Sequence, residues 1–96
     1  MPIYRIKARA LMEFLRANKK EFNLQEAQLI FPHDTRNILW DLELDGFLST
    51  RFVKRGKGGG RGRPHAIFYF NRSNLDKIKR VFGYVLVEEG IIMPDD

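Results

Sequence analysis

Hydrophobic residues recur at intervals of three and four along the first eighteen residues of the chain. They are Ile3, Ile6, Ala10, Leu11, Phe14 and Leu15. This spacing places all six side chains on one side of a helix. The pattern therefore predicts a first helix over about residues 3–19, with this side buried.

Two shorter helices are predicted next. Asn23 and Glu26 have the spacing of a capping box, which predicts a second helix over about residues 24–31. Asp34 is expected to cap a third helix over about residues 34–45, and Gly46 is expected to end it. The residues expected to face the core from this third helix are Ile38, Leu39 and Leu42.

A hairpin and a last helix complete the pattern. Residues 47–54 and 66–70 are rich in β-forming side chains, and the segment between them holds five of the chain's eight glycines. These features predict a two-stranded wing over about residues 47–71. Helical spacing then returns and predicts a fourth helix over about 73–89, capped by Asn71 or Ser73. Its apolar stripe consists of Leu75, Ile78, Val81, Phe82, Val85 and Leu86.

The order of these elements predicts one α+β domain of 96 residues, with a three-helix core, a hairpin and an additional C-terminal helix. Over residues 5–88 this order resembles the winged helix-turn-helix family. Residues 38–48 are similar to the end of that family's recognition helix, where a leucine, three mostly polar residues, a glycine and two apolar residues precede the first wing strand. Residues 62–70 resemble the wing of small MarR- and PadR-like regulators, such as those of archaeal viruses and plasmids.

Positive charge is concentrated in the predicted wing. The chain has a net charge of +5, yet residues 51–65 alone contain six Lys or Arg and no acidic residue. Such a cluster favours a polyanionic partner, and the resemblance implies double-stranded DNA. The residues expected to contact the DNA backbone or the minor groove are Arg51, Lys54, Arg55, Lys57, Arg61, Arg63 and His65.

The tip of the wing has a motif of its own. Arg61-Gly62-Arg63-Pro64 matches the core of an AT-hook, which lays arginines into the narrow minor groove of A·T-rich DNA. The same four residues also fit the end of an ordinary wing. A third interpretation is flexible RNA binding of the RGG type, which rests on a single partial repeat.

The third helix supplies the candidates for base recognition. In helix-turn-helix proteins, the N-terminal residues of this helix contact base edges in the major groove. Arg36 and Asn37 can each make two hydrogen bonds to a purine, and His33 lies beside them. The alternative is that these residues only form a solvated helix surface. Further phosphate contacts are expected from the first helix and the turn after it, at Lys7, Arg9, Arg16, Lys19 and Lys20.

The resemblance implies that the apolar stripe of the fourth helix forms a symmetric homodimer. Such a dimer places two recognition helices about one DNA turn, roughly 34 Å, apart. The alternative is that the helix completes the core of its own chain. Trp40 and Leu44 form a second apolar patch, expected to pack against the first helix, with the fourth helix or a partner chain as alternatives.

Other classes of function have little support in the sequence. The chain has no cysteine, its two histidines are far apart, and no catalytic triad or carboxylate pair is visible. We therefore expect no enzymatic activity, metal, cofactor or small-molecule ligand. No apolar run approaches the ~18 residues of a membrane span, so a cytoplasmic, nucleoid-associated protein without membrane contact is expected.

These features predict a small dimeric transcriptional regulator that binds double-stranded DNA. The first alternative is an architectural or plasmid-partition protein that binds DNA with low sequence specificity. The second is a winged-helix module that binds another protein.

Overall fold

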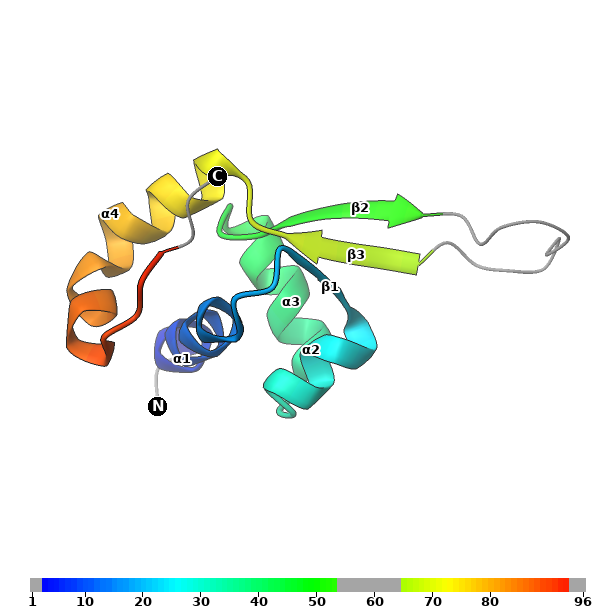
Figure 1. Cartoon of the computed structure of the whole chain (residues 1–96). Helices are drawn as coiled ribbons and strands as arrows, with labels where there is room; N and C mark the ends of the chain where they lie inside the picture. The colour runs from blue at the N-terminus through cyan, green and yellow to red at the C-terminus, as the bar shows by residue number, and fades with distance from the viewer. Residues whose placement is uncertain (1–2, 54–64, 94–96) are drawn as a thin grey trace, which may run out of the picture.

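The computed structural model describes residues 3–53 and 65–93. Within these ranges the chain is α+β, as predicted, with four helices and a three-stranded antiparallel sheet. The elements are α1 (Ile3–Ala17), β1 (Glu21–Asn23), α2 (Leu24–Ile30), α3 (Thr35–Leu44), β2 (Ser49–Val53), β3 (His65–Tyr69) and α4 (Arg72–Glu89). Three helices followed by a hairpin and a further helix have the arrangement of a winged helix-turn-helix fold (Figure 1).

The sheet has one strand more than the sequence pattern indicates. Its order is β1-β3-β2, and β1 pairs with β3 so that Phe22 lies opposite Phe68. β2 pairs with β3 from Ser49 opposite Tyr69 to Val53 opposite His65. β1 was not predicted, because three residues carry no measurable alternation and the strand exists only by pairing with the edge of β3.

The helices begin and end within two residues of their predicted positions. α1 ends at Ala17 because Asn18 has a φ of 54°, a left-handed conformation that asparagine tolerates better than most residues. α3 ends in a Schellman motif: Gly46, with a φ of 83°, donates its N–H to Glu43, and Phe47 donates to Leu42. Of the four helices in the described ranges, none is long and apolar enough to cross a membrane.

The predicted capping box at the start of α2 is confirmed. The Asn23 side chain accepts a hydrogen bond of 2.8 Å from the N–H of Glu26, and the Glu26 carboxylate accepts one of 2.9 Å from the N–H of Asn23. Lys19 also donates to Glu26, at 2.9 Å. These bonds stabilise the ionised form of Glu26 and so lower its pKa. The bond from Lys19 has the largest effect, and the bond from the Asn23 N–H has the next largest.

This lowered pKa predicts a stability that depends on pH. Glu26 has a lower pKa in the folded chain than in the unfolded chain. Its ionised carboxylate therefore stabilises the folded chain fully above the ordinary glutamate pKa, about 4.3, and this stabilisation is lost as the pH falls through the pKa of the folded chain. Urea unfolding from pH 7 to pH 3 should therefore show wild-type stability approaching that of Glu26→Gln in acid. A difference in the free energy of unfolding between the two proteins that is the same at every pH would contradict this assignment.

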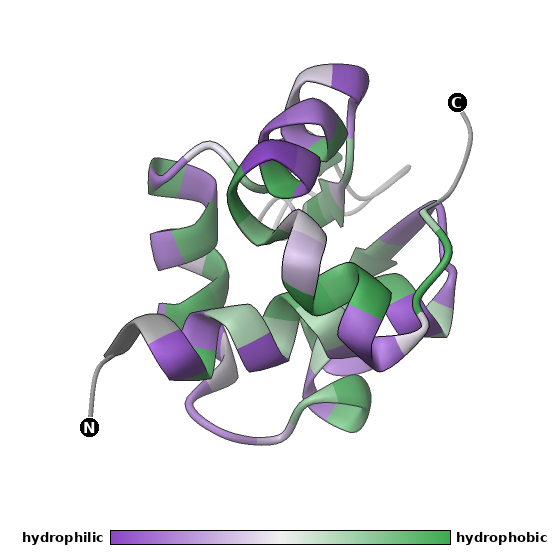
Figure 2. Ribbon diagram, turned by 90° about the vertical axis from the view of Figure 1, so that its left-hand side faces the viewer, coloured by the Kyte–Doolittle hydropathy of each residue, from purple (hydrophilic) through white to green (hydrophobic). Residues whose placement is uncertain are grey.

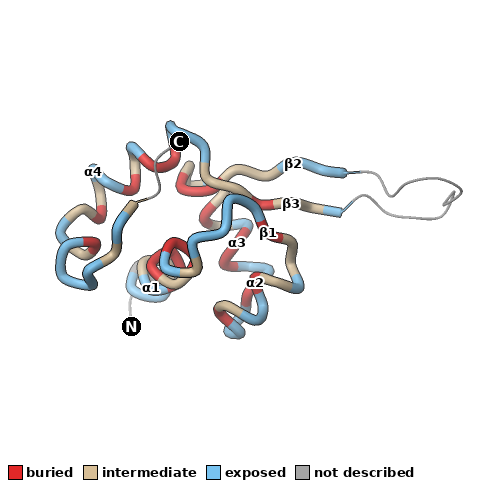
Figure 3. Tube along the Cα trace, viewed as in Figure 1, coloured by how far each residue is buried: buried red, intermediate tan, exposed pale blue. Residues whose placement is uncertain are grey.

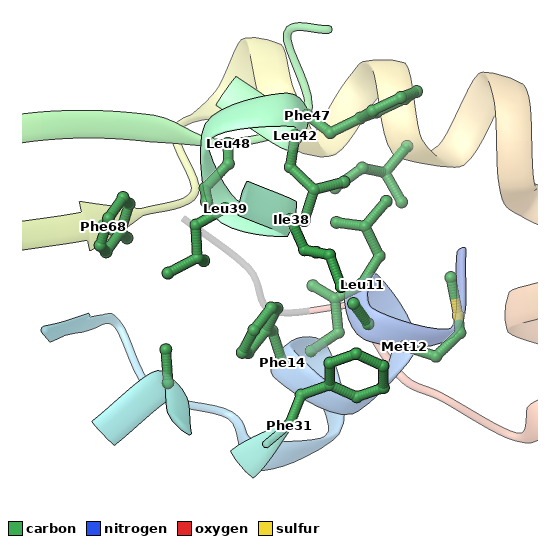
Figure 4. Packing of buried hydrophobic residues seen from close by; sticks show 14 of the residues in the cluster. Leu11, Met12, Phe14, Phe31, Ile38, Leu39, Leu42, Phe47, Leu48 and Phe68 are labelled. Carbon is green, nitrogen blue, oxygen red and sulfur yellow. The ribbon is translucent and has the colours of Figure 1, made fainter. Parts of the chain in front are cut away.

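The core is built around phenylalanine rings. Phe14 of α1 stacks on Phe22 of β1 with ring centroids 5.1 Å apart, and Phe22 lies 6.0 Å from Phe68 of β3. Phe14 also meets the edge of Phe31, at 6.4 Å. In Figure 4, Leu11 and Phe14 lie opposite Ile38 and Leu39 of α3. α1 thus joins the sheet to the helix-turn-helix pair.

α4 belongs to the same core. Leu75, Ile78, Phe82 and Leu86 are buried within the single chain, whereas Val81 and Val85 are half-buried (Figure 3). All six residues were predicted to form a dimer interface. This prediction is corrected for the four buried residues, because they lie inside their own chain and not on its surface. An amphipathic stripe does not reveal whether it meets its own chain or a partner. Here α1 and Phe47, which follows α3, pack against it.

A polar cluster fixes the start of α4. Asn71, not Ser73, caps the helix, and Asn74 forms the reciprocal half of a capping box. The buried Asn74 side chain also accepts from Ser49 Oγ at 2.7 Å and donates to the carbonyl of Gly46 at 2.8 Å. These bonds connect α4 to the end of α3 and the start of β2.

Two apolar residues of the helices are exposed, one of which, Ile6, was assigned to the buried side of α1. Ile6 of α1 and Leu29 of α2 lie at the surface, with Leu29 85% exposed. Hydrophobic and hydrophilic positions alternate along the helices (Figure 2), but each helix has a partner along only part of its apolar side.

Candidate nucleic-acid interface

α3 is held from one side and exposed on the other. Thr35, Ile38, Leu39 and Leu42 are buried, and the Thr35 hydroxyl donates to the carbonyl of Phe31 at 2.7 Å. This bond fixes the start of α3 against the end of α2. The side chains left exposed along α3 are Arg36, Asn37, Trp40 and Leu44.

The turn before α3 differs from the predicted cap. Asp34 occupies the predicted N-cap position, but it has a φ of 51° and its side chain accepts no hydrogen bond from the helix backbone. Its carboxylate instead accepts a hydrogen bond of 2.9 Å from the Asn37 amide. The sequence could not show this, because the left-handed backbone at Asp34 turns the carboxylate away from the N–H groups it was expected to cap.

The three predicted base-reading residues lie together and are exposed. His33, Arg36 and Asn37 lie within one turn at the N-terminal end of α3. The His33 ring contacts the edge of the Phe31 ring at 5.3 Å, which anchors the turn to the core. Arg36 has an exposed guanidinium at a helix position open to solvent, as contact with a base edge requires.

One carboxylate at the acidic end of α3 is paired within the chain. The carboxylate of Asp45 pairs with Lys7 of α1 at 2.9 Å. Lys77 of α4 donates to the Asp45 carbonyl, and its ammonium lies 5.1 Å from the centre of the Phe47 ring. Cations at this position stabilise the negative end of a helix. Lys7 was predicted to contact phosphate, but it is already paired here.

Other cations of α1 and its turn are also engaged. Arg16 pairs with Glu13 at 2.9 Å and with Glu89 of α4 at 3.0 Å. The hydrogen bond that Arg16 donates to Glu89 is the main cause of the raised pKa of Arg16. Lys19 pairs with Glu26. Of the five predicted phosphate anchors, Arg9 and Lys20 are exposed and form no ion pair with another described residue.

The described strands of the wing, β2 and β3, extend away from α4 (Figure 1). Arg51 of β2 pairs with Glu21 of β1 at 2.7 Å, and since β3 lies between these strands, the pair crosses the outer face of the sheet. His65 is exposed at the far end of β3. The remaining candidates lie outside the described residues, as does the AT-hook-like motif: Lys54, Arg55, Lys57, Arg61 and Arg63.

An aromatic surface between α3 and the wing was not predicted. Trp40 meets the edge of the Phe68 ring at 5.9 Å, so it packs on the sheet and not on α1, and Leu44 is 80% exposed. Phe52 lies on the same face of the sheet as Phe68 but is 63% exposed, because β2 extends beyond the helices. Strand alternation through Thr50 and Phe52 could have revealed this position.

Among the residues that the structure describes, no group of three His, Asp or Glu side chains is arranged to hold a metal ion. No protein-family model matches the chain, and a comparison with curated proteins found no significant similarity.

Proposed function

We propose that this protein binds double-stranded DNA as a small transcriptional regulator, acting on the nucleoid in the cytoplasm. The observation that carries this proposal is the exposed N-terminal turn of α3, which presents Arg36 and Asn37, in a chain whose hairpin leads into a basic segment. A helix exposed in this way fits the major groove, and the charges of the hairpin suit the neighbouring phosphates.

The distribution of ion pairs supports this orientation. At the acidic end of α3, the Asp45 carboxylate is paired with Lys7 and the Asp45 carbonyl accepts a hydrogen bond from Lys77, so part of the negative charge there is compensated by α1 and α4. The opposite end of α3 carries Arg36, for which no acidic partner exists among the described side chains. Phosphate would therefore be attracted to the N-terminal end of α3 and to the wing.

One observation favours DNA binding with low sequence specificity as the second candidate. The Asn37 amide is already bonded to Asp34, and Arg51 is already bonded to Glu21. Each must give up or share a hydrogen bond before it can contact DNA. Specificity would then rest mainly on Arg36, with most of the affinity coming from phosphate contacts.

Selection from random duplexes at one fixed, near-physiological salt concentration tests the proposal. An enriched sequence whose affinity falls by about 0.9 logarithmic units per phosphate contact for each tenfold rise in salt supports the regulator. Tight, salt-dependent binding without enrichment supports the low-specificity candidate. Absence of duplex binding contradicts both and favours a protein-binding module, for which Trp40 and Leu44 would be the exposed contacts.

Arg36→Ala should weaken binding to the selected site by about 1–3 kcal/mol, roughly 5- to 150-fold, and should relax preference at one base pair. The reason is the loss of a two-pronged contact to a guanine edge. Arg36→Lys keeps the charge but not the planar fork, so it should restore affinity for random DNA and not the base preference. Competition binding against site variants measures both quantities.

Arg80→Ala is the matched control, since Arg80 is an exposed arginine on α4, away from the wing. It should leave base preference unchanged. If Arg36→Ala and Arg80→Ala weaken binding equally and neither alters the preference, α3 does not read the major groove through Arg36.

A further inference from the structure

Three aromatic rings connect α3 to the hairpin of β2 and β3. Trp40 of α3 meets the edge of the Phe68 ring, with ring centroids 5.9 Å apart. Phe52 of β2 lies opposite Ala66, two residues before Phe68 on β3, so Phe52 and Phe68 are diagonal neighbours on one face of the sheet. Such neighbours lie roughly 7–8 Å apart, within reach of aromatic side chains. Phe68 therefore links Trp40 to Phe52.

The two outer rings are open to solvent, whereas the middle ring is not. Phe68 is buried, but Trp40 is 37% exposed and Phe52 is 63% exposed, where β2 reaches the surface (Figure 3). Thr50 and Ala66, which lie on the same face of the sheet, have small side chains. Tryptophan and phenylalanine each have only two rotatable side-chain bonds, so they can contact a ligand at a low cost in conformational entropy.

The charges near these rings differ between the two ends of α3. Arg36 lies one helical turn before Trp40, is exposed, and forms no ion pair with another described residue. Asp41 and Glu43 follow Trp40 and are half-buried. On the hairpin, the sequence after β2 contains five Lys or Arg and no acidic residue over 54–64. A polyanion is therefore attracted to the Arg36 side and to the hairpin, and is repelled from the C-terminal end of α3.

We infer that Trp40 and Phe52 bind unpaired bases of DNA, so that the preferred substrate is a duplex interrupted by a few unpaired nucleotides. This inference rests on the proposed DNA binding. In a paired duplex each base is stacked between its neighbours, and a mismatched base is the least costly to unstack. An unpaired base can stack on an aromatic side chain whatever its sequence, because every base has a flat face. The paired part of the duplex is then held by Arg36 and by the basic segment.

The combination of rings and charge favours DNA over an apolar protein partner. A strand with unpaired bases needs flat apolar surfaces for the bases and positive charge for the phosphates. Trp40 and Phe52 supply the surfaces, and Arg36 supplies an available cation one turn away. An apolar protein surface would use the rings alone. It would also be expected to cover Leu44, which is 80% exposed on the acidic side of Trp40.

The test compares a fully paired duplex with the same duplex carrying a short central run of mismatched thymines. The wild-type chain should bind the mismatched duplex about 5- to 150-fold more tightly, which is the range for stacking one base on an aromatic ring. Trp40 is the only tryptophan of the chain, so its fluorescence reports on this surface directly. At saturation the mismatched duplex should quench that fluorescence more strongly than the paired duplex does.

Variants of Phe52 show whether the ring itself is needed. Phe52→Leu keeps an apolar side chain without the ring, so it should lose most of the preference for mismatched DNA and keep the affinity for paired DNA. Phe52→Tyr keeps the ring and should keep the preference. Circular dichroism verifies that each variant is folded.

Tyr84→Leu is the matched control, because it removes a ring that is 69% exposed from α4. It should leave the preference unchanged. Equal affinity of the wild-type chain for both duplexes would overturn the inference, as would a Phe52→Leu variant that keeps the preference or loses affinity for both duplexes equally. Each of these results leaves the proposed binding to paired DNA in place. Absence of binding to either duplex would overturn the inference and the proposed function together.

Discussion

Replacing Lys54, Arg55, Lys57, Arg61 and Arg63 together by alanine is expected to weaken duplex binding by at least about 100-fold at about 0.1 M salt. These five residues carry most of the positive charge between Arg51 and His65, where the chain has no acidic residue. A plot of log affinity against log salt concentration has a slope of about 0.9 for each phosphate that the protein contacts. Loss of up to five such contacts should therefore make the slope shallower by up to about 4.5. Fluorescence anisotropy over a salt series measures both quantities.

The control removes charge of the same kind from the other end of the molecule. Lys79 and Arg80 are exposed on α4, and the double variant Lys79→Ala/Arg80→Ala should change the salt slope little. The contribution per charge can then be compared between the two variants. If both lose the same affinity per charge removed, the attraction reflects net charge alone, and the wing has no specific part in binding.

Phe14→Ala is expected to lower the free energy of unfolding by about 3–5 kcal/mol. Phe14 is 1% exposed and joins three parts of the core, since its ring contacts Phe22 of β1 and Phe31 after α2. Removing the ring leaves a cavity at the point where α1 meets the sheet and the helix-turn-helix pair. A small domain has a total stability of about 5–15 kcal/mol, so this loss is a large fraction of it. Urea unfolding followed by circular dichroism measures the change.

Phe52→Ala is the matched control, because it removes the same ring from a site that is 63% exposed. Its effect on stability should stay within about 0.5 kcal/mol. Phe14→Leu fills part of the cavity and should remain folded with an intermediate stability, which keeps the comparison measurable. Similar losses for Phe14→Ala and Phe52→Ala would contradict the assignment of the core.

The predictions that agree with the structure rest on local interactions. Asn23 and Glu26 form their capping box within one turn, and Gly46 ends α3 by adopting a conformation that few other residues tolerate. The spacing of Leu11, Phe14 and Leu15 likewise defines a buried side of α1. Interactions over three or four residues depend little on the rest of the chain, so a single sequence is enough to identify them.

The candidate DNA-binding residues were only partly predictable. Exposure of Arg36 and Asn37 follows from their place on α3, opposite the buried positions, and His33 is exposed in the turn before this helix. The bond between Asn37 and Asp34 does not, because it depends on one left-handed residue. The pair between Arg51 and Glu21 also could not be foreseen, since it requires β1 to be a strand.

The sequence by itself determined where the helices and the hairpin lie, which glycines and asparagines end or begin them, and that the basic charge gathers in the wing. Only the tertiary structure decided which partner each apolar side chain meets. It added β1 to the sheet, placed Leu75 and Ile78 in the core of their own chain, and left Tyr84 and Phe52 exposed. The physical reason is that periodicity fixes which side of an element is apolar, whereas contacts between residues far apart in the chain fix what covers it.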